Sequence, residues 1–308
     1  MQNSAFIFPG QGSQTIGMLA ELAEEHSIIT QTFSQTSNEL GYDLWDLVQQ
    51  GPIETLNKTD KTQPALLTAS VAIWRIFEAS GKTQPKLMAG HSLGEYSALV
   101  CAGVIDFIDA VKLVELRGEL MQQAVPVGTG AMFAVIGLNH NAIAKACEDG
   151  AEGEVVSPVN YNSPGQVVIA GSKAAVKRAA ALCKVAGAKM VVALPVSVPS
   201  HCELMRPAAE KLAVALESIE FKTPQIKVIN NVDVASPKSA SEIKDALVRQ
   251  LYCPVLWSAT VKAISEQGVT RLFEIGPGKV LTRLAKRIDR SLITKVVNDV
   301  ASLAELTQ

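Results

Sequence analysis

The sequence predicts an α/β protein with a mainly parallel sheet and a small inserted domain, and three patterns support this fold class. Short apolar runs that end at Gly or Pro alternate with longer segments of helical periodicity in the first and last parts of the chain. Between residues 126 and 198 this alternation is broken, because two strand-like runs follow one another directly. Apolar residues form 48% of the chain, which is enough to build a sizeable core.

The first part of the chain alternates strand and helix. Proline suits the first turn of a helix, so Pro64 is expected to open the first long one. The expected elements are a strand at 5–8, a helix from Pro64 toward Gly81, a strand at 87–89, a helix at 93–101 and a helix after Asp106.

The middle of the chain is predicted to follow the order β-α-β-β-α-β, which is the ferredoxin-like arrangement. A strong turn signal, Asn162-Ser163-Pro164-Gly165, separates the two adjacent strands. The expected elements are strand 132–136, helix 141–148, strands 154–160 and 166–170, helix 172–185 and strand 189–194. We therefore expect a small domain at 126–198, inserted into a large domain formed by 1–125 and 199–308.

After the insertion the α/β alternation resumes. The expected elements are strand 226–232, helices 241–251 and 258–266, strand 271–275 and helix 279–288. The formal net charge is −2, so no overall basic field favours a nucleic-acid partner. No apolar run reaches the length of a membrane span, and the N-terminus lacks the features of a signal peptide.

The five cysteines are scattered without a C-x-x-C pair, which favours reduced thiols in a cytoplasmic protein and no metal site. Cys202 stands beside His201, so a thiol nucleophile is one hypothesis. A buried structural cysteine is the commoner case.

Gly90-His91-Ser92-Leu93-Gly94 fits the pattern G-x-S-x-G. A predicted strand precedes Ser92 and a predicted helix follows it, which is the context of a nucleophile elbow. There a tight turn exposes the serine hydroxyl, and the helix N-terminus supplies N–H groups and a positive dipole end. The alternative is a Gly-rich turn in an ordinary α/β fold.

A serine hydroxyl needs a base to attack at neutral pH, and the chain has four histidines. His201 follows a predicted strand, where sites of α/β proteins form, and is the best candidate. A structural role for this loop histidine is the alternative. His91 lies within the elbow, but an adjacent side chain usually points elsewhere.

Two further residues attract interest. Arg117 lies in the apolar stripe of the helix after Asp106, and a buried guanidinium needs either a protein carboxylate or an anionic ligand. Gln11 lies between two glycines directly after the first strand. This loop lacks the lysine of a phosphate loop, so it is either a source of an oxyanion-binding N–H group or a plain tight turn.

At these residues the chain resembles the malonyl-CoA:acyl carrier protein transacylases, over nearly its whole length. The motifs that carry the resemblance are Phe8-Pro9-Gly10-Gln11-Gly12-Ser13-Gln14, Thr62-Gln63-Pro64-Ala65-Leu66, Gly90-His91-Ser92-Leu93-Gly94-Glu95, Arg117-Gly118, Ser200-His201, Pro254-Val255 with Trp257, and Glu274-Ile275-Gly276-Pro277-Gly278.

The resemblance implies a role for each site residue. Ser92 would be acylated with His201 as the base, and Arg117 would bind the malonyl carboxylate. The backbone N–H groups of Gln11 and Leu93 would form the oxyanion hole. An amide residue near the position of Gln250 would orient the histidine, mainly through its carbonyl.

The resemblance also implies an α/β-hydrolase-like core and a malonyl-serine intermediate. The sequence leaves open whether the carrier protein serves fatty-acid or polyketide synthesis, and we expect fatty-acid synthesis. The substrates would be malonyl-CoA and acyl carrier protein, with no cofactor and no metal. We expect a cytoplasmic monomer that binds neither nucleic acid nor membrane.

Two other functions fit parts of the sequence. A serine esterase shares G-x-S-x-G, but the acidic residues between Ser92 and His201 lie in helices or in the inserted domain. A non-catalytic scaffold would not need every site residue. A basic patch on the last predicted helix and just beyond it is either a docking surface for an acidic carrier protein or a solvated helix face. Its members are Lys279, Arg283, Lys286, Arg287 and Arg290.

Overall fold

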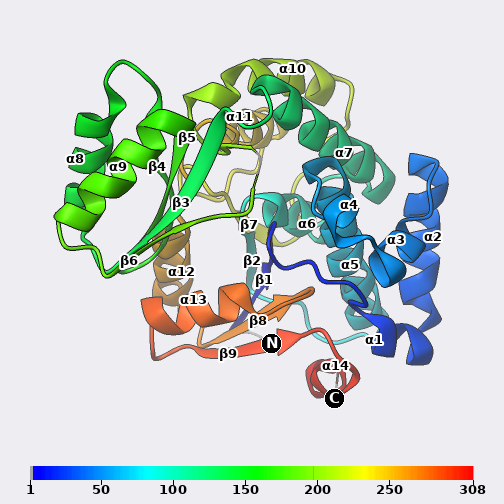
Figure 1. Ribbon diagram of the computed structural model, residues 1–308. Coiled ribbons are helices and arrows are strands. Elements are labelled where there is room, and N and C mark those ends of the chain that lie inside the picture. The colour runs from blue at the N-terminus through cyan, green and yellow to red at the C-terminus, as the bar shows by residue number, and fades with distance from the viewer. Residues whose placement is uncertain (1–2, 197, 308) are drawn as a thin grey trace.

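The computed structural model describes residues 3–196 and 198–307 and contains two separate β-sheets (Figure 1). Met1, Gln2, Ser197 and Gln308, which the predicted domain ranges include, lie outside the described residues. The larger sheet is parallel throughout, with strand order β7-β2-β1-β8-β9. Its strands are β1 (Ser4–Phe8), β2 (Leu87–Gly90), β7 (Lys227–Ile229), β8 (Arg271–Ile275) and β9 (Ile293–Val297).

Both faces of this sheet are buried, as expected for parallel strands joined by helices. Along β1, Phe6 and Phe8 face the largest apolar core, whereas Ala5 and Ile7 face a smaller one. The smaller core is closed by α12 (Trp257–Glu266) and α13 (Val280–Ile288).

The other helices outside residues 130–193 contribute to the largest core. They are α1 (Ala20–Glu25), α2 (Ser27–Leu40), α3 (Leu44–Gln50), α4 (Ile53–Leu56), α5 (Thr59–Ala79), α6 (Leu93–Cys101), α7 (Phe107–Ala124), the 3-10 helix η1 (Glu203–Met205), α10 (Arg206–Glu217), α11 (Ala240–Gln250) and α14 (Val300–Thr307).

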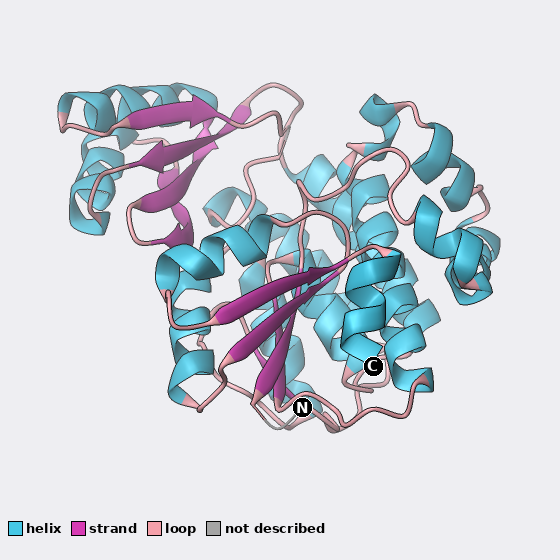
Figure 2. Ribbon diagram, turned by 90° about the horizontal axis from the view of Figure 1, so that it is seen from below, coloured by secondary structure: helices cyan, strands magenta, loops and turns pink. Residues whose placement is uncertain are grey.

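The smaller sheet has strand order β4-β5-β3-β6, and each neighbouring pair is antiparallel. Its elements are β3 (Gly130–Ile136), α8 (His140–Ala151), β4 (Val156–Ser163), β5 (Gln166–Ser172), α9 (Lys173–Val185) and β6 (Met190–Ala193). Both helices pack on one face of this sheet, and the other face contributes to a small cluster that includes Cys202. Figure 2 shows this sheet with its two helices beside the parallel sheet. The predicted order of elements in the middle of the chain is therefore confirmed.

Strand β4 connects the smaller sheet to the segment before α12. Tyr161 N donates to Val255 O at 2.9 Å, and Val255 N donates to Val159 O at 2.8 Å. These two bonds form one step of a parallel ladder between β4 and the segment before α12. These backbone hydrogen bonds join the small sheet to the segment that leads into α12.

Three predicted boundaries are wrong. The strand predicted at 226–232 covers only Lys227–Ile229, and the strand predicted at 154–160 is Val156–Ser163, which leaves only Pro164 and Gly165 in the turn.

The third boundary is the start of the first long helix. Helix α5 begins at Thr59, so Pro64 lies inside it rather than at its first turn. The first turn is closed by Thr62 N, which donates to Lys58 O at 2.8 Å. The first turn of α5 is polar, so the sequence shows no apolar pattern there. In the structure this turn packs closely on α7. A Cβ atom added at Gly118 would lie 2.6 Å from Asp60 Cα.

Two C-terminal elements, β9 and α14, were not predicted from the pattern. Strand β9 is an edge strand with Ile293 exposed and only Val297 fully buried, so it lacks the continuous apolar run of a central strand.

Candidate active site

Ser92 occupies the tight turn between β2 and α6, with φ 51° and ψ −107°. The glycines of the motif are required by close backbone contacts. A Cβ atom at Gly90 would lie 1.9 Å from Gly94 O, and one at Gly94 would lie 2.0 Å from Phe8 O. The strained backbone at Ser92 and the missing side chains on both sides produce the geometry of a nucleophile elbow.

The loop after β1 packs directly against this elbow. A Cβ atom at Gly10 would lie 2.4 Å from His91 O. This contact places Gln11 beside the turn, where it lines the same cavity as Ser92. Leu93 is the first residue of α6, where a backbone N–H has no acceptor within the helix.

His201 stands next to Ser92, and its Nε2 lies 2.9 Å from the Ser92 hydroxyl oxygen. The other ring nitrogen, Nδ1, lies 2.6 Å from the backbone oxygen of Gln250. A carbonyl oxygen can only accept, so Nδ1 carries the proton and Nε2 is left to accept from the serine hydroxyl. Burial, reinforced by the nearby positive charge of Arg117, lowers the pKa of His201 to about 3. The imidazole is therefore neutral at physiological pH.

Arg117 projects from α7 and is only 1% exposed. Its Nη1 donates to Gln63 Oε1 at 2.8 Å, and its Nη2 donates to Gln250 Oε1 at 2.9 Å and to the Ser92 hydroxyl oxygen at 3.3 Å. Each of these partners is uncharged. Of the two alternatives from the sequence, the geometry therefore favours an anionic ligand over a structural ion pair.

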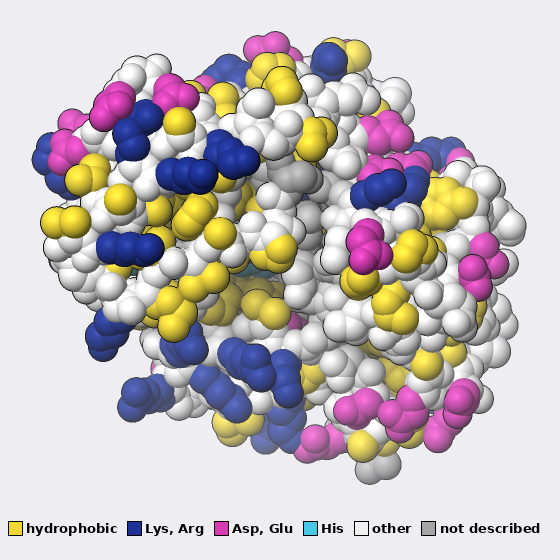
Figure 3. Space-filling model, viewed as in Figure 1, with side chains coloured by type: hydrophobic (Ala, Val, Ile, Leu, Met, Phe, Trp, Pro, Cys, Tyr) yellow, Lys and Arg dark blue, Asp and Glu magenta, His cyan; other side chains and the backbone are white. Residues whose placement is uncertain are grey.

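A cavity of about 100 Å³ lies above these groups, at the junction of the two sheets. Figure 3 shows that the surface is hollowed at this cavity, between the small sheet and the helices opposite it. Its lining residues are Gln11, Thr59, Gln63, His91, Ser92, Leu93, Arg117, Met121, Met132, Asn160, Leu194, Val196, Val198, Ser200 and His201.

The cavity brings together five of the six predicted site residues, and Gln250 lies behind them. Its backbone oxygen holds the histidine, whereas its side-chain oxygen holds Arg117. His91 points away from Ser92 toward Asn162 Oδ1, which lies 2.9 Å from its Nε2. Cys202 is buried, and burial raises the pKa of its thiol to about 11, which makes it a poor nucleophile.

Two contact residues were not singled out from the sequence. Gln63 holds Arg117, and the signal for it is a buried amide on an otherwise apolar helix beside Pro64. Asn231 accepts from Ser92 N at 2.7 Å and donates to Gly90 O at 2.6 Å, so it bridges both sides of the elbow. It follows strand β7 in the sequence and carries no local motif.

Within the described residues, no three His, Cys, Asp or Glu side chains are grouped closely enough to hold a metal ion. No helix in that part of the chain has the length and apolar character that crossing a membrane requires.

Comparison with known proteins places this geometry in a family. The acyl transferase domain family matches residues 5–306. The chain is 63% identical to the malonyl CoA-acyl carrier protein transacylase of Salmonella typhimurium, with all of both chains covered. It is 65% identical to the protein of that name from Haemophilus influenzae, over 98% of this chain and 97% of the relative.

Two solved structures are also similar. An acyl carrier protein S-malonyltransferase from Vibrio cholerae superposes with a TM-score of 0.97 at 65% identity, covering 99% of this chain and all of that one. A complex of a type II PKS acyl-carrier protein with its malonyl-transacylase gives a TM-score of 0.98 at 63% identity, covering 99% of each chain. The chain therefore belongs to the acyl transferase domain family.

Proposed function

We propose that this chain moves a malonyl group from malonyl-CoA to the phosphopantetheine thiol of acyl carrier protein, through an ester on Ser92, and so supplies fatty-acid elongation. One observation carries the proposal. The hydroxyl of Ser92 lies 2.9 Å from a neutral imidazole and 3.3 Å from a buried guanidinium. A base activates the serine, and a cation this close selects an acyl group with a carboxylate near its reacting carbon.

In the first half-reaction the Ser92 oxygen attacks the thioester carbonyl carbon while His201 Nε2 takes the hydroxyl proton. The backbone N–H groups of Gln11 and Leu93 donate to the oxyanion of the tetrahedral intermediate. The C–S bond then breaks, and His201 returns the proton to the sulfur of departing CoA. The product of this step is malonyl-serine.

In the second half-reaction the carrier thiol gives its proton to His201, and its sulfur attacks the ester carbonyl carbon. The C–O bond to Ser92 breaks and the serine oxygen recovers the proton. No redox change occurs, so the reaction as written needs no cofactor.

The contact of His201 with a backbone carbonyl supports transfer over an esterase triad, in which an Asp or Glu holds the histidine. A carbonyl oxygen fixes the tautomer but carries no full charge. It therefore stabilises the imidazolium less than a carboxylate would.

We also propose a two-domain organisation, with residues 1–125 and 199–308 as an α/β-hydrolase-like catalytic domain and 126–198 as a ferredoxin-like domain. The strand order β4-β5-β3-β6 and the two helices on one face support the second assignment. The elbow between a parallel strand and a helix supports the first. The cysteines of the described residues are free thiols, which supports a cytoplasmic location.

Replacing the nucleophile tests the covalent step. Ser92→Ala is expected to abolish the malonyl adduct that intact-protein mass spectrometry detects after incubation with malonyl-CoA. His201→Ala should slow adduct formation while keeping Ser92 as its site. An adduct of unchanged mass and yield in Ser92→Ala would move the nucleophile to another residue.

Replacing the cation tests substrate selection. Arg117→Ala is expected to lower malonyl transfer at least about tenfold more than acetyl transfer, because a charged hydrogen bond contributes roughly 1.5–3 kcal/mol. The measurement is kcat/KM for both CoA thioesters. Equal losses for both would contradict the assignment of Arg117 to the malonyl carboxylate.

The protonation state of the base is also testable. With a pKa of about 3, the His201 ring should stay neutral as the pH falls through 6.5, since both burial and the Arg117 charge oppose protonation. Ring ¹⁵N chemical shifts of the folded protein between pH 8 and 5 measure this. A His201 transition near pH 6.5 would contradict the proposed environment.

The basic patch is proposed as the carrier-protein docking surface. Its five residues are exposed on α13 and on the segments on either side of it. Figure 3 shows basic side chains gathered on the part of the surface where α13 lies. Arg287 Nη1 donates to Gln166 Oε1 at 3.0 Å, so the patch also borders the small sheet. Acyl carrier proteins are acidic, and opposite charge favours their association.

Charge reversal tests the docking surface. Arg283→Glu combined with Lys286→Glu is expected to raise the KM for carrier protein several-fold at low salt and less at high salt, because salt screens exposed charges. A matched control, Lys211→Glu with Lys222→Glu, makes the same change of charge at exposed positions elsewhere. If the patch variant and the control variant have the same KM for carrier protein, docking at α13 is contradicted.

A further inference from the structure

Glu95 is a buried carboxylate directly beneath the site, and neither the mechanism nor substrate binding uses it. It lies in the first turn of α6, three positions after Ser92, and is 2% exposed. Its Oε2 accepts from the side-chain Nε2 of Gln250 at 2.8 Å and from the backbone N of Asn231 at 2.9 Å. A buried carboxylate is costly, so this position calls for a physical reason.

The contacts of Gln250 supply that reason. An amide side chain has a donor end and an acceptor end, and both orientations fit nearly the same space. Here Nε2 faces Glu95 and the Ser92 carbonyl oxygen, and Oε1 faces Arg117. A carboxylate only accepts and a guanidinium only donates. Glu95, with the shorter of the two contacts and assisted by the Ser92 carbonyl oxygen, therefore favours the orientation in which Gln250 presents its oxygen to Arg117.

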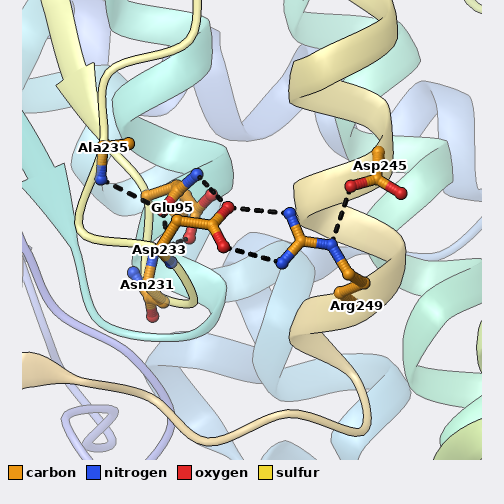
Figure 4. A network of polar contacts seen from close by, with 7 residues as sticks. Glu95, Asn231, Asp233, Ala235, Asp245 and Arg249 are labelled. Carbon is orange, nitrogen blue, oxygen red and sulfur yellow. Dashed lines mark hydrogen bonds and ion pairs between the residues drawn. The ribbon is translucent and has the colours of Figure 1, made fainter.

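Glu95 also joins two segments that are far apart in the sequence. Gln250 is the last residue of α11, and Asn231 belongs to the loop after β7. Figure 4 shows Glu95 and Asn231 beside a second connection between these segments, in which both terminal nitrogens of Arg249 donate to Asp233 at 2.8 and 2.7 Å. Asn231 in turn bridges Ser92 and Gly90. The carboxylate thus connects the elbow, the loop and the end of α11.

We propose that Glu95 is a positioning residue that orients the Gln250 amide, and through it holds Arg117 in place for the substrate carboxylate. The inference rests on the role proposed above for Arg117. The burial that this arrangement requires raises the pKa of Glu95 to about 7, against the opposing effects of its hydrogen bonds and of Arg117. The site keeps this acid although its surroundings disfavour the charged form.

Three substitutions separate reach from charge. Glu95→Gln keeps the length and one acceptor oxygen but removes the charge. Glu95→Asp keeps the charge but is one methylene too short to hold Gln250. Glu95→Ala removes both. A matched control is Glu274→Ala, because Glu274 is equally buried but accepts from Leu281 N and Thr282 N at the start of α13.

The readout is the ratio of kcat/KM for malonyl-CoA to that for acetyl-CoA, with thermal unfolding recorded in parallel. We expect Glu95→Ala and Glu95→Asp to lower this ratio about fivefold, the effect of one typical hydrogen bond, mainly through the KM for malonyl-CoA. Glu95→Gln should keep the ratio within about twofold. Glu274→Ala should lower stability and leave the ratio unchanged.

A purely structural role for Glu95 predicts a different result. Malonyl and acetyl transfer would fall by the same factor in Glu95→Ala, as in the control, and the inference would be overturned. If Glu95→Ala does not fold, equal ratios in the Asp and Gln variants overturn it instead. Arg117→Ala distinguishes the two levels. If Arg117→Ala leaves the malonyl-to-acetyl ratio of kcat/KM unchanged, the role of Arg117 itself is refuted. If Arg117→Ala lowers that ratio but Glu95→Asp leaves it unchanged, only the role of Glu95 is refuted.

Discussion

The site is organised around one buried positive charge that makes its hydrogen bonds to uncharged groups. Arg117 is almost fully enclosed, and the oxygens of two amides and one serine accept its hydrogen bonds. An ionised group in such surroundings is expensive, because hydrogen bonds replace only part of its hydration. A carboxylate of the protein in contact with Arg117 would have offset part of this cost, but it would also have occupied the guanidinium. Leaving the guanidinium without a carboxylate in contact keeps it available for one that arrives with the substrate.

The same charge also governs the base. Arg117 adds to burial in lowering the pKa of His201, so the free site holds a weak base. In the proposed mechanism the malonyl carboxylate offsets the Arg117 charge and so raises the basicity of His201 in the complex. A substrate without a carboxylate would leave the base weak. Selection by Arg117 then acts on the chemical step as well as on binding, which is how binding energy contributes to kcat.

The sequence predicts the fold and the reacting groups better than it predicts the groups that support them. Apolar runs located four strands of the parallel sheet, and the alternation of strands and helices located the four strands of the smaller sheet. The edge strand β9 was missed because it is largely exposed. Ser92 was found because its glycines are required by contacts within one turn. Asn231 acts through contacts with residues distant in sequence, so no local pattern marks it. Gln63 lies in a motif, but its contact with Arg117 links two helices and could not be read from that motif. The start of α5 was misplaced because its first turn is polar in sequence, although it packs closely against α7 in the fold.

The base His201 and the acid Glu95 have opposite effects on the pH dependence of stability. His201 has a lowered pKa, so the unfolded chain takes up protons first, and stability falls as the pH drops from 6.5 toward about 3. Glu95 has a raised pKa, so the unfolded chain loses its proton first, and stability falls as the pH rises from 4.5 to about 7. Above that range the folded protein carries the full cost of a charged Glu95. A charged Glu95 beneath the nucleophile therefore lowers the stability of the folded protein, and in return it keeps Gln250 and Arg117 in position for the substrate.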